Sequence, residues 1–253
     1  MYTKCFGFRE FPFNVSCDSR FFYANRAYQE SYIDLRYGIK LRKGLIVLTG
    51  KSGTGKTTLI EMVQDRCESN IHMAVVSNCG RDIAELLRLT MQAFGLKDLP
   101  LDRHAMIPRF KAYLTDQLKH GHIVAMAIDE AQDLDLQTLN ELESISELQS
   151  ADQNLCQIVL AGRPELTTKL ESPALWSLRK RVAVWREVGP LKPDEIGAYI
   201  EHRLVVAGYQ GKGLFEPDAV EQIATYSTGI PSLINGPAAI VVLPSLSWCC
   251  SQT

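Results

Sequence analysis

The sequence predicts an α/β fold with a mostly parallel five-stranded sheet flanked by helices. Two observations predict it. Short apolar runs alternate with longer helix-like segments over the first 190 residues, which is typical of parallel strands joined by crossover helices. One of these runs also ends in a glycine-rich loop that opens a helix. From Leu191 the pattern is helical only, so we expect a sheet-containing core at 1–190 and a small helical lid at 191–253.

The glycine-rich loop has the sequence G-K-S-G-T-G-K-T and the form G-x-x-x-x-G-K-[ST] of a phosphate-binding loop (P-loop). The apolar run 45–49 precedes it and a helix-like segment follows it, which argues against a chance match in a glycine-rich turn. In this context backbone N–H groups surround phosphate, and the helix dipole favours negative charge. The loop lysine contacts the β- and γ-phosphates, and the next hydroxyl binds Mg²⁺.

The loop therefore predicts ATP and Mg²⁺ as ligands. We assign Lys56 to nucleotide binding and catalysis, and Thr57 to nucleotide and metal binding. The other candidate nucleotide-binding residues of this segment are Gly50, Lys51, Ser52, Gly53, Thr54, Gly55 and Thr58.

An acidic pair follows a second apolar run. Residues 122–128 are apolar and end directly at Asp129 and Glu130. In P-loop ATPases an acidic residue at such a strand end holds the Mg²⁺ shell, and a neighbouring glutamate can orient or deprotonate the attacking water. We assign Asp129 to the metal and Glu130 to catalysis. Acidic residues also favour the first turn of a helix, and the following segment is helix-like, so both explanations hold together.

The other elements follow from hydrophobic periodicity. We expect further strands at 71–76, 155–161 and 181–185, and helices at 81–94, 107–119, from 131 to about 148, at 193–208 and at 216–229. Because ligands bind beyond the carboxyl ends of parallel strands, the P-loop, Asp129–Glu130 and Gly162–Arg163 should converge. A strand between the P-loop strand and its acidic partner would place the core in the ATPase division that carries a catalytic glutamate.

Composition excludes some classes of protein. The 253 residues are 46% hydrophobic and 22% charged, as in a soluble globular protein, and the net charge of −2 gives no global basic field for nucleic acid. A local basic cluster at 36–43 could form a nucleic-acid patch, but such clusters are more often a solvated helix face. The seven cysteines show no metal spacing, so we expect reduced thiols in a cytosol. We expect neither a signal peptide nor a membrane span, because the apolar run 238–250 is short and contains Pro244.

The first 43 residues are rich in aromatic side chains. We expect them to cap the nucleotide end of the core, either by packing alone or by stacking on adenine.

These segments together resemble AAA+ ATPases of the general secretion pathway protein A type, a family that includes ATPases of pilus and exopolysaccharide systems. The similarity extends to about Asn235. It is carried by the opening segment 1–14, Tyr37–Ile39, Gly50–Thr57, Ile128–Gln132, Gly162–Leu166, 199–208 and Gly229–Pro231.

The resemblance implies an oligomeric ATPase with sites at subunit boundaries. A neighbour's arginine would stabilise the γ-phosphate, and Arg179 and Arg181 occupy the expected place, with Arg181 preferred. The alternative is that these arginines form a basic surface turn. The resemblance also implies an assembly or energising factor for an envelope secretion or pilus system, cytoplasmic or peripheral at the inner membrane.

Three positions depart from the family pattern. Arg163 stands where a neutral polar residue usually senses the γ-phosphate, so we keep it as a nucleotide-binding candidate with an added charge. Ser232 replaces a lid arginine. Gly236-Pro237 should break the last lid helix, which leaves the lid atypical or truncated after Asn235.

Two other functions stay open. One is a DNA-associated AAA+ regulator of the transposition type, which shares the P-loop, the acidic pair and the lid. The other is a nucleotide-dependent scaffold with weak turnover, which the serine at position 232 keeps open.

Overall fold

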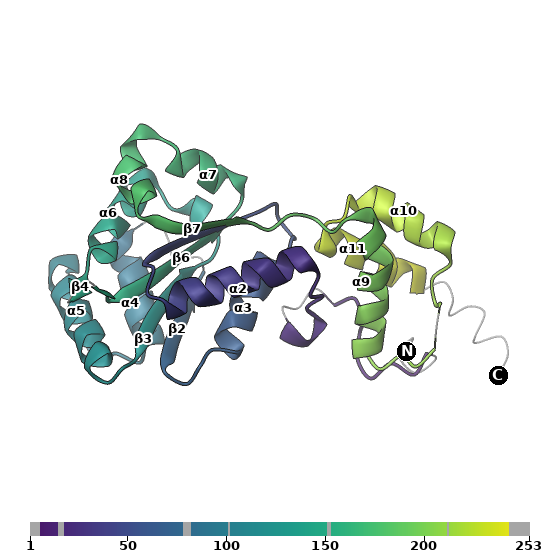
Figure 1. The fold of residues 1–253 in the computed structure, drawn as a ribbon, viewed down its shortest axis with the longest axis horizontal. Helices are drawn as coiled ribbons and strands as arrows, with labels where there is room; N and C mark the ends of the chain where they lie inside the picture. The colour runs from purple at the N-terminus through teal and green to yellow at the C-terminus, as the bar shows by residue number, and fades with distance from the viewer. Residues whose placement is uncertain are drawn as a thin grey trace.

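A computed structural model describes residues 6–14, 18–77, 82–100, 102–150, 153–211 and 213–242. Its centre is a five-stranded sheet in the order β2-β3-β6-β1-β7, with every neighbouring pair parallel (Figure 1). The strands are β1 (Leu45–Thr49), β2 (Ile71–Val76), β3 (Ile123–Ile128), β6 (Cys156–Gly162) and β7 (Val182–Glu187); a separate hairpin pairs β4 (Gln149–Ser150) with β5 (Gln153–Asn154). The predicted α/β fold is confirmed.

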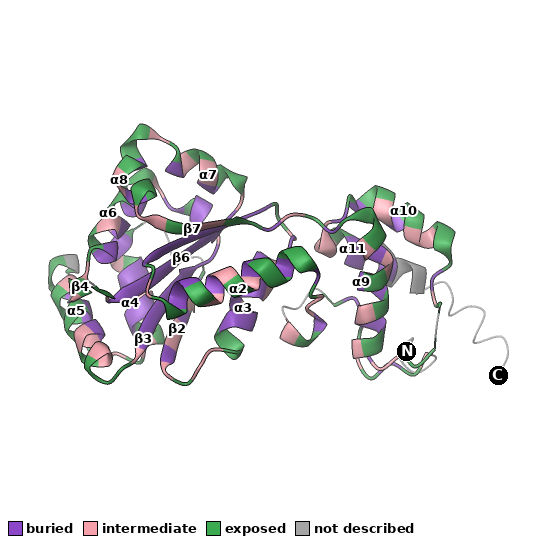
Figure 2. Cartoon of the chain, in the orientation of Figure 1, coloured by how far each residue is buried: buried purple, intermediate pink, exposed green. Residues whose placement is uncertain are grey.

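Helices cover both faces of the sheet, and the buried strands alternate side chains between two apolar clusters. Ile46 and Leu48 pack with α2 (Arg26–Lys40) and α3 (Lys56–Asp65). Leu45 and Val47 pack with the helices of the other face, which are α4 (Ile83–Ala93), α5 (Arg103–Lys119), α6 (Leu136–Ser146), α7 (Pro164–Leu170) and α8 (Trp176–Lys180). Strands β1, β3 and β6 are buried throughout (Figure 2), as parallel strands covered on both faces must be.

The strand order meets the condition set by the sequence. Strand β6 lies between β1, which leads into the P-loop, and β3, which leads into the acidic pair. The core therefore has the additional strand between the P-loop strand and the strand that ends in the acidic pair.

In the part of the chain that the structure describes, three helices follow the sheet, and they lie at the right of Figure 1 beyond the carboxyl ends of the strands. They are α9 (Pro193–Val206), α10 (Pro217–Ser227) and α11 (Pro231–Val242). Short 3₁₀ turns complete the fold at η1 (Ser19–Phe21), η2 (Ala131–Asp133) and η3 (Pro173–Leu175).

The aromatic N-terminal segment divides between two places. Residues 6–14 pack on the C-terminal helices and not on the sheet: Arg9 N–H donates to the Ala207 carbonyl at 2.7 Å, and the Phe13 ring meets the Phe215 ring edge-on. Among the described N-terminal aromatics, those from Phe21 to Tyr28 line the cavity beside the P-loop. The expectation of a cap on the core is therefore correct for that part alone.

Two helices differ from their sequence predictions because packing outweighs proline. Helix α5 begins at Arg103, not residue 107, and continues through Pro108. Its buried face, Met106, Phe110 and Leu114, spans the proline at four-residue spacing. Helix α11 likewise continues through Gly236-Pro237, so the predicted break is wrong. Ile234 and Ala238, one turn apart and both fully buried, anchor its two halves.

A third helix begins later than predicted. The segment after Glu130 first forms η2, and α6 starts only at Leu136, capped by the Asp135 side chain, which accepts a hydrogen bond from the Thr138 N–H. The acidic pair thus lies in a turn and not in a helix.

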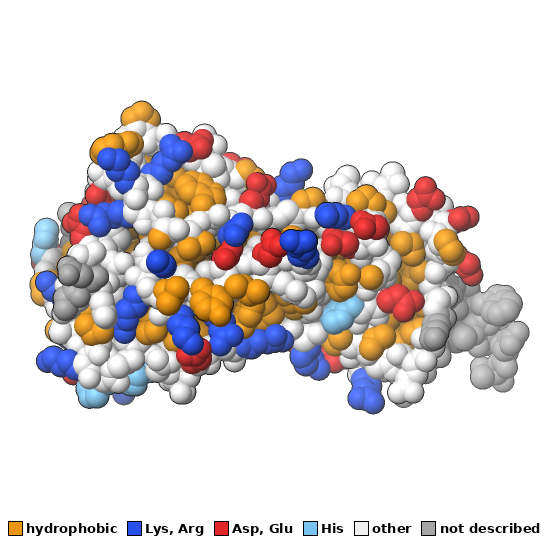
Figure 3. All heavy atoms as spheres, viewed as in Figure 1, with side chains coloured by type: hydrophobic (Ala, Val, Ile, Leu, Met, Phe, Trp, Pro, Cys, Tyr) orange, Lys and Arg blue, Asp and Glu red, His pale blue; other side chains and the backbone are white. Residues whose placement is uncertain are grey.

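The basic cluster at 36–43 is largely engaged within the chain. Arg36 and Lys40 both pair with Glu68, at 3.1 and 2.7 Å, and Arg42 donates to the His122 carbonyl. Figure 3 shows acidic and basic side chains interspersed on one face of the molecule.

Two further observations concern cysteines and membrane spans. Cys67 and Cys156 are free thiols, and the other five cysteines lie outside the described residues. Among the residues that the structure describes, no helix combines the length and the apolar character needed to cross a bilayer.

Candidate active site

The P-loop adopts a conformation that only its glycines permit. It leaves β1 at Thr49 and enters α3 at Lys56. Gly53 and Gly55 have φ of 78° and 93°, in the left-handed region that side chains disfavour. A Cβ at Gly50 would lie 2.3 Å from the Val188 carbonyl oxygen. The loop is therefore closely wrapped, with room for backbone and not for side chains.

The Lys56 ammonium lies inside this loop. Its Nζ donates to the carbonyls of Gly50 at 2.9 Å and Lys51 at 3.0 Å. Burial lowers the pKa of this ammonium, and the negative charges of Glu130 and Asp129 act in the opposite direction. Lys51 and Ser52 are exposed at the tip of the loop. The cation is thus held at the centre of the cradle, beside two carboxylates.

The next residue meets the end of β3. Thr57 Oγ1 donates to Asp129 Oδ2 at 2.5 Å, and Asp129 Oδ1 accepts the Glu130 N–H at 2.9 Å. Asp129 is buried. A hydroxyl and a carboxylate in contact form the kind of hard oxygen set that Mg²⁺ prefers, commonly together with waters and substrate phosphates. These two residues therefore fit a magnesium ion.

Glu130 is held by neighbours from two strand ends. Its φ is 53°, which few non-glycine residues adopt. Its Oε2 accepts a hydrogen bond from Gln132 Nε2 at 2.7 Å and lies 3.6 Å from Arg163 Nε. The Arg163 N–H in turn donates to Gln132 Oε1 at 2.8 Å. The structure thus places Arg163 beside Glu130, at the carboxyl end of β6.

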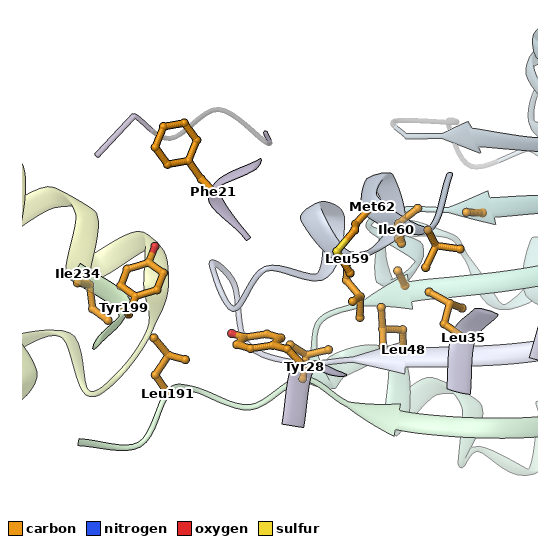
Figure 4. Packing of buried hydrophobic residues seen from close by; sticks show 14 of the residues in the cluster. Phe21, Tyr28, Leu35, Leu48, Leu59, Ile60, Met62, Leu191, Tyr199 and Ile234 are labelled. Carbon is orange, nitrogen blue, oxygen red and sulfur yellow. The ribbon is translucent and has the colours of Figure 1, made fainter. Parts of the chain in front are cut away.

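A cavity of about 200 Å³ lies between the P-loop and the C-terminal helices. The helices contact the loop directly, because Ser232 N–H donates to the Gly53 carbonyl at 3.2 Å. Figure 4 shows Phe21 and Tyr28 between the core side chains and those of Leu191, Tyr199 and Ile234. The cavity is lined by residues 53–58, Glu130, five aromatic side chains (Phe21, Phe22, Tyr23, Tyr28 and Tyr199), Asn14, Arg203, Pro231, Ser232 and Asn235.

Comparison with known proteins agrees with this geometry. Residues 39–170, about half of the chain, match a family model described as AAA domain. The chain belongs to the AAA-domain family. It is 32% identical over 239 residues to general secretion pathway protein A of Aeromonas hydrophila, a match that covers 93% of this chain and 43% of that relative. The chain therefore spans less than half the length of the relative.

Solved structures of AAA-type proteins share its fold. The ORC2 protein of Aeropyrum pernix, in ADPNP and ADP complexes, matches with a TM-score of 0.67 and 16% identity over 93% of this chain and 65% of that one. The ORC1 protein of Aeropyrum pernix, in complex with DNA, matches with a TM-score of 0.68 and 15% identity. The match covers 95% of this chain and 65% of that one. At these identities the likeness concerns the fold alone.

The two candidate arginines of this AAA-domain chain lie away from its own P-loop. Arg181 precedes β7, whose Val182 is opposite Leu45 and whose Glu187 is opposite Thr49. It is therefore at the amino edge of the sheet, about 15–20 Å from the loop at roughly 3.3 Å per residue. There it pairs with Glu143 and Glu147, while Arg179 pairs with Glu171 at 3.8 Å.

Two residues at the cavity make contacts that the sequence did not predict, although Tyr28 belongs to the aromatic segment expected to cap the core. The Tyr28 hydroxyl donates to the Thr54 carbonyl at 2.6 Å and so braces the P-loop from α2. Arg203, buried in α9, donates to the carbonyls of Pro12 and Asn14 and so links the N-terminal segment to the C-terminal helices. The sequence did contain an indication for Arg203. This residue falls at the three- and four-residue spacing of the buried face of α9, and a buried arginine needs hydrogen-bond or ion-pair partners.

A glycine substitution tests the close packing of the P-loop. Gly50→Ala should lower the melting temperature, because the new Cβ meets backbone that cannot move aside, and overpacking typically costs about 1–3 kcal/mol. Gly197→Ala is the matched control: its Cβ would meet only Val220, at 3.7 Å, within α9. Thermal unfolding should show equal or higher stability for the control. A Gly50→Ala protein as stable as wild type would contradict the close contact with Val188.

Proposed function

We propose that this chain binds ATP with Mg²⁺ and hydrolyses it to ADP and phosphate. The observation that carries the proposal is the meeting of Lys56, Thr57, Asp129 and Glu130 at the carboxyl ends of two strands, beside one cavity. Each is the residue type that phosphoryl transfer requires at that place.

The roles follow from the geometry. Lys56 contacts the β- and γ-phosphates from within the loop, and N–H groups of residues 53–58 surround them. Thr57 and Asp129 hold Mg²⁺, which neutralises charge on the phosphate oxygens. Glu130, with an acceptor oxygen at the cavity, orients the attacking water and accepts its proton. Arg163 lies next to Glu130, where it can donate hydrogen bonds to the γ-phosphate.

The aromatic side chains between loop and lid form the apolar part of the site. Rings of Phe21, Phe22 and Tyr23 line the cavity beside Tyr28 and the lid residue Tyr199. Such walls suit the flat apolar faces of a purine base. We propose that helices α9, α10 and α11 act as a lid. The lid closes on the base and contacts the P-loop through Ser232.

The arginines complete the site from a second copy of the chain. Arg181 is too far along β7 to reach its own P-loop, so a catalytic role requires a neighbouring subunit. This supports an oligomer with sites at subunit boundaries. The Arg181 side chain is 34% exposed beside Glu147, so part of the guanidinium lies at the surface, where a neighbour can contact it.

We further propose that the ATPase serves as an assembly or energising factor for an envelope secretion or pilus system, at the inner face of the inner membrane. The relative from Aeromonas hydrophila that carries this proposal is named for general secretion. Flanking genes offer a check: secretion or pilus genes would support the assignment, and a transposase gene would favour the DNA-associated alternative. Salt-dependent DNA binding would favour the same alternative.

Lysine substitutions test nucleotide binding. Lys56→Ala should abolish ATP binding or nearly so, because it removes the one ammonium held inside the cradle. Lys43→Ala is a matched control, since it removes an exposed lysine before the other end of the same strand. Titration with a fluorescent ATP analogue measures both. Wild-type affinity in a folded Lys56→Ala protein would remove the basis of the proposed function.

A further inference from the structure

Gln132 is a buried amide whose two ends bond to different parts of the site. It is 5% exposed. Its Nε2 donates to Glu130 Oε2 at 2.7 Å, and its Oε1 accepts the Arg163 N–H at 2.8 Å. The side chain thus links the carboxylate that follows β3 to the main chain that follows β6. An amide offers both a donor and an acceptor, whereas a carboxylate cannot donate and an ammonium cannot accept.

The surroundings of Gln132 fix it in place. Lys169 Nζ, from α7, donates to the carbonyls of Gln132 at 2.6 Å and Leu134 at 2.7 Å. A Cβ at Gly162, the last residue of β6, would lie 2.8 Å from Gln132 Oε1 and 3.2 Å from its backbone nitrogen. The glycine therefore makes room for the amide, and the η2 turn is held against β6 and α7.

Glu130 itself has little else to orient it. Its side chain is 40% exposed, and its backbone lies in the left-handed region. Arg163 Nε approaches the same Oε2 at 3.6 Å, beyond hydrogen-bond distance. The 2.7 Å bond from Gln132 is therefore the short contact that sets the carboxylate's direction.

We propose that Gln132 is a positioning residue for hydrolysis, which holds the Glu130 carboxylate in place and couples it to the end of β6 at Arg163. This inference rests on the proposed ATPase function. Contact between Arg163 and a phosphate can move the main chain at the end of β6. Gln132 would pass that movement to Glu130, because its side chain is hydrogen-bonded to both. Without the amide, the carboxylate turns toward the Arg163 guanidinium and away from the water.

The first test separates turnover from binding. Gln132→Ala should lower kcat by about 10–100-fold, the effect expected of a misplaced catalytic group. The Kd for an ATP analogue should stay within about threefold, because no P-loop contact is lost. Gln132→Glu keeps an acceptor for the Arg163 N–H but cannot donate to Glu130, so its kcat should fall as well. A kcat that falls only together with stability and affinity would instead indicate a structural role, and would overturn the inference.

The second test reaches Gln132 without altering it. Gly162→Ala should displace the amide and lower kcat in the same way, and its effect should be largely absent on a Gln132→Ala background, because both act through one contact. Gly197→Ala is the matched control and should keep wild-type kcat. Fully additive losses would contradict the coupling.

A structural readout makes the inference independent of activity. A crystal structure of Gln132→Glu or Gly162→Ala should show the Glu130 carboxylate away from its wild-type position, with the P-loop unchanged. An unmoved carboxylate, or wild-type kcat in Gln132→Glu, would overturn the inference and leave the proposed function intact. If wild-type protein binds ATP and does not hydrolyse it, the proposed function fails, and the positioning role fails with it. Should Gln132→Ala not fold, Gln132→Glu and Gly162→Ala decide the outcome.

Discussion

Glu130→Gln should bind ATP as wild type does and hydrolyse it about 10²–10⁴-fold more slowly, the usual loss when a general base is removed. Glutamine keeps the size of the side chain and an acceptor oxygen for the Gln132 amide, so the turn after β3 should keep its shape. What it loses is the negative charge that can take a proton from water. Phosphate release under saturating ATP, together with analogue titration, measures the two properties separately.

The matched control for this variant is Asp133→Asn. It makes the same carboxylate-to-amide change three residues further on, at a side chain that is 65% exposed and 3.5 Å from Arg163. The control should keep wild-type turnover, because Asp133 lies outside the cavity lining. Equal losses in the two variants would point to the charge around Arg163 and not to a base at Glu130. Wild-type turnover in Glu130→Gln would move the catalytic role to another residue.

Arg181→Ala should bind ATP normally and lose turnover by about 10³-fold, since an arginine supplied by a neighbour contributes at least this much in related phosphoryl transfer. The position of Arg181, at the amino edge of the sheet, excludes help to its own P-loop. Wild-type activity per subunit should therefore rise with protein concentration as subunits associate. Because the family resemblance implies a lid arginine where this chain has Ser232, we expect basal turnover to be slow.

Two controls separate a shared site from local damage. Glu147→Gln removes one of the two ion-pair partners of Arg181 without removing the arginine, so it should keep turnover if the guanidinium acts in a neighbour's site. Mixing Arg181→Ala with Lys56→Ala should restore activity, because some interfaces then combine an intact loop with an intact arginine. A mixture that stays inactive while both variants fold and co-assemble would disprove the shared site in favour of Arg179 or an arginine of the same chain.

The P-loop could be predicted from the sequence because its structure is local. A strand, a loop with glycines at fixed offsets and a helix are contiguous in the chain, and the φ of Gly53 and Gly55 needs no distant contact to explain it. The buried strands were equally accessible, since a strand covered on both faces is continuously apolar. The meeting of Gly50, Asp129 and Arg163 could also be predicted. Each residue follows a parallel strand, and the carboxyl ends of parallel strands lie at one edge of the sheet.

Prolines show where local reasoning failed. The pair Gly236-Pro237 predicts a helix break, yet α11 continues through it. The helix predicted at 107–119 begins earlier, at Arg103, with Pro108 inside it. A proline inside a helix costs about 3 kcal/mol. Burial of several large apolar side chains offsets this cost, as Met106, Phe110 and Leu114 show in α5, because each contributes about 1.5–3 kcal/mol. That comparison needs the packed structure.

The sequence alone determined the class of fold, the phosphate-binding loop and the acidic pair, because each is encoded by neighbours in the chain. Tertiary structure decided the rest: the place of β6 between β1 and β3, the packing of residues 6–14 on α9, and the link from Glu130 through Gln132 to Arg163. Gln132 and Arg163 are 31 residues apart, and nothing in their spacing indicates a bond. Such contacts depend on strand order and side-chain direction, which arise only when distant segments pack together.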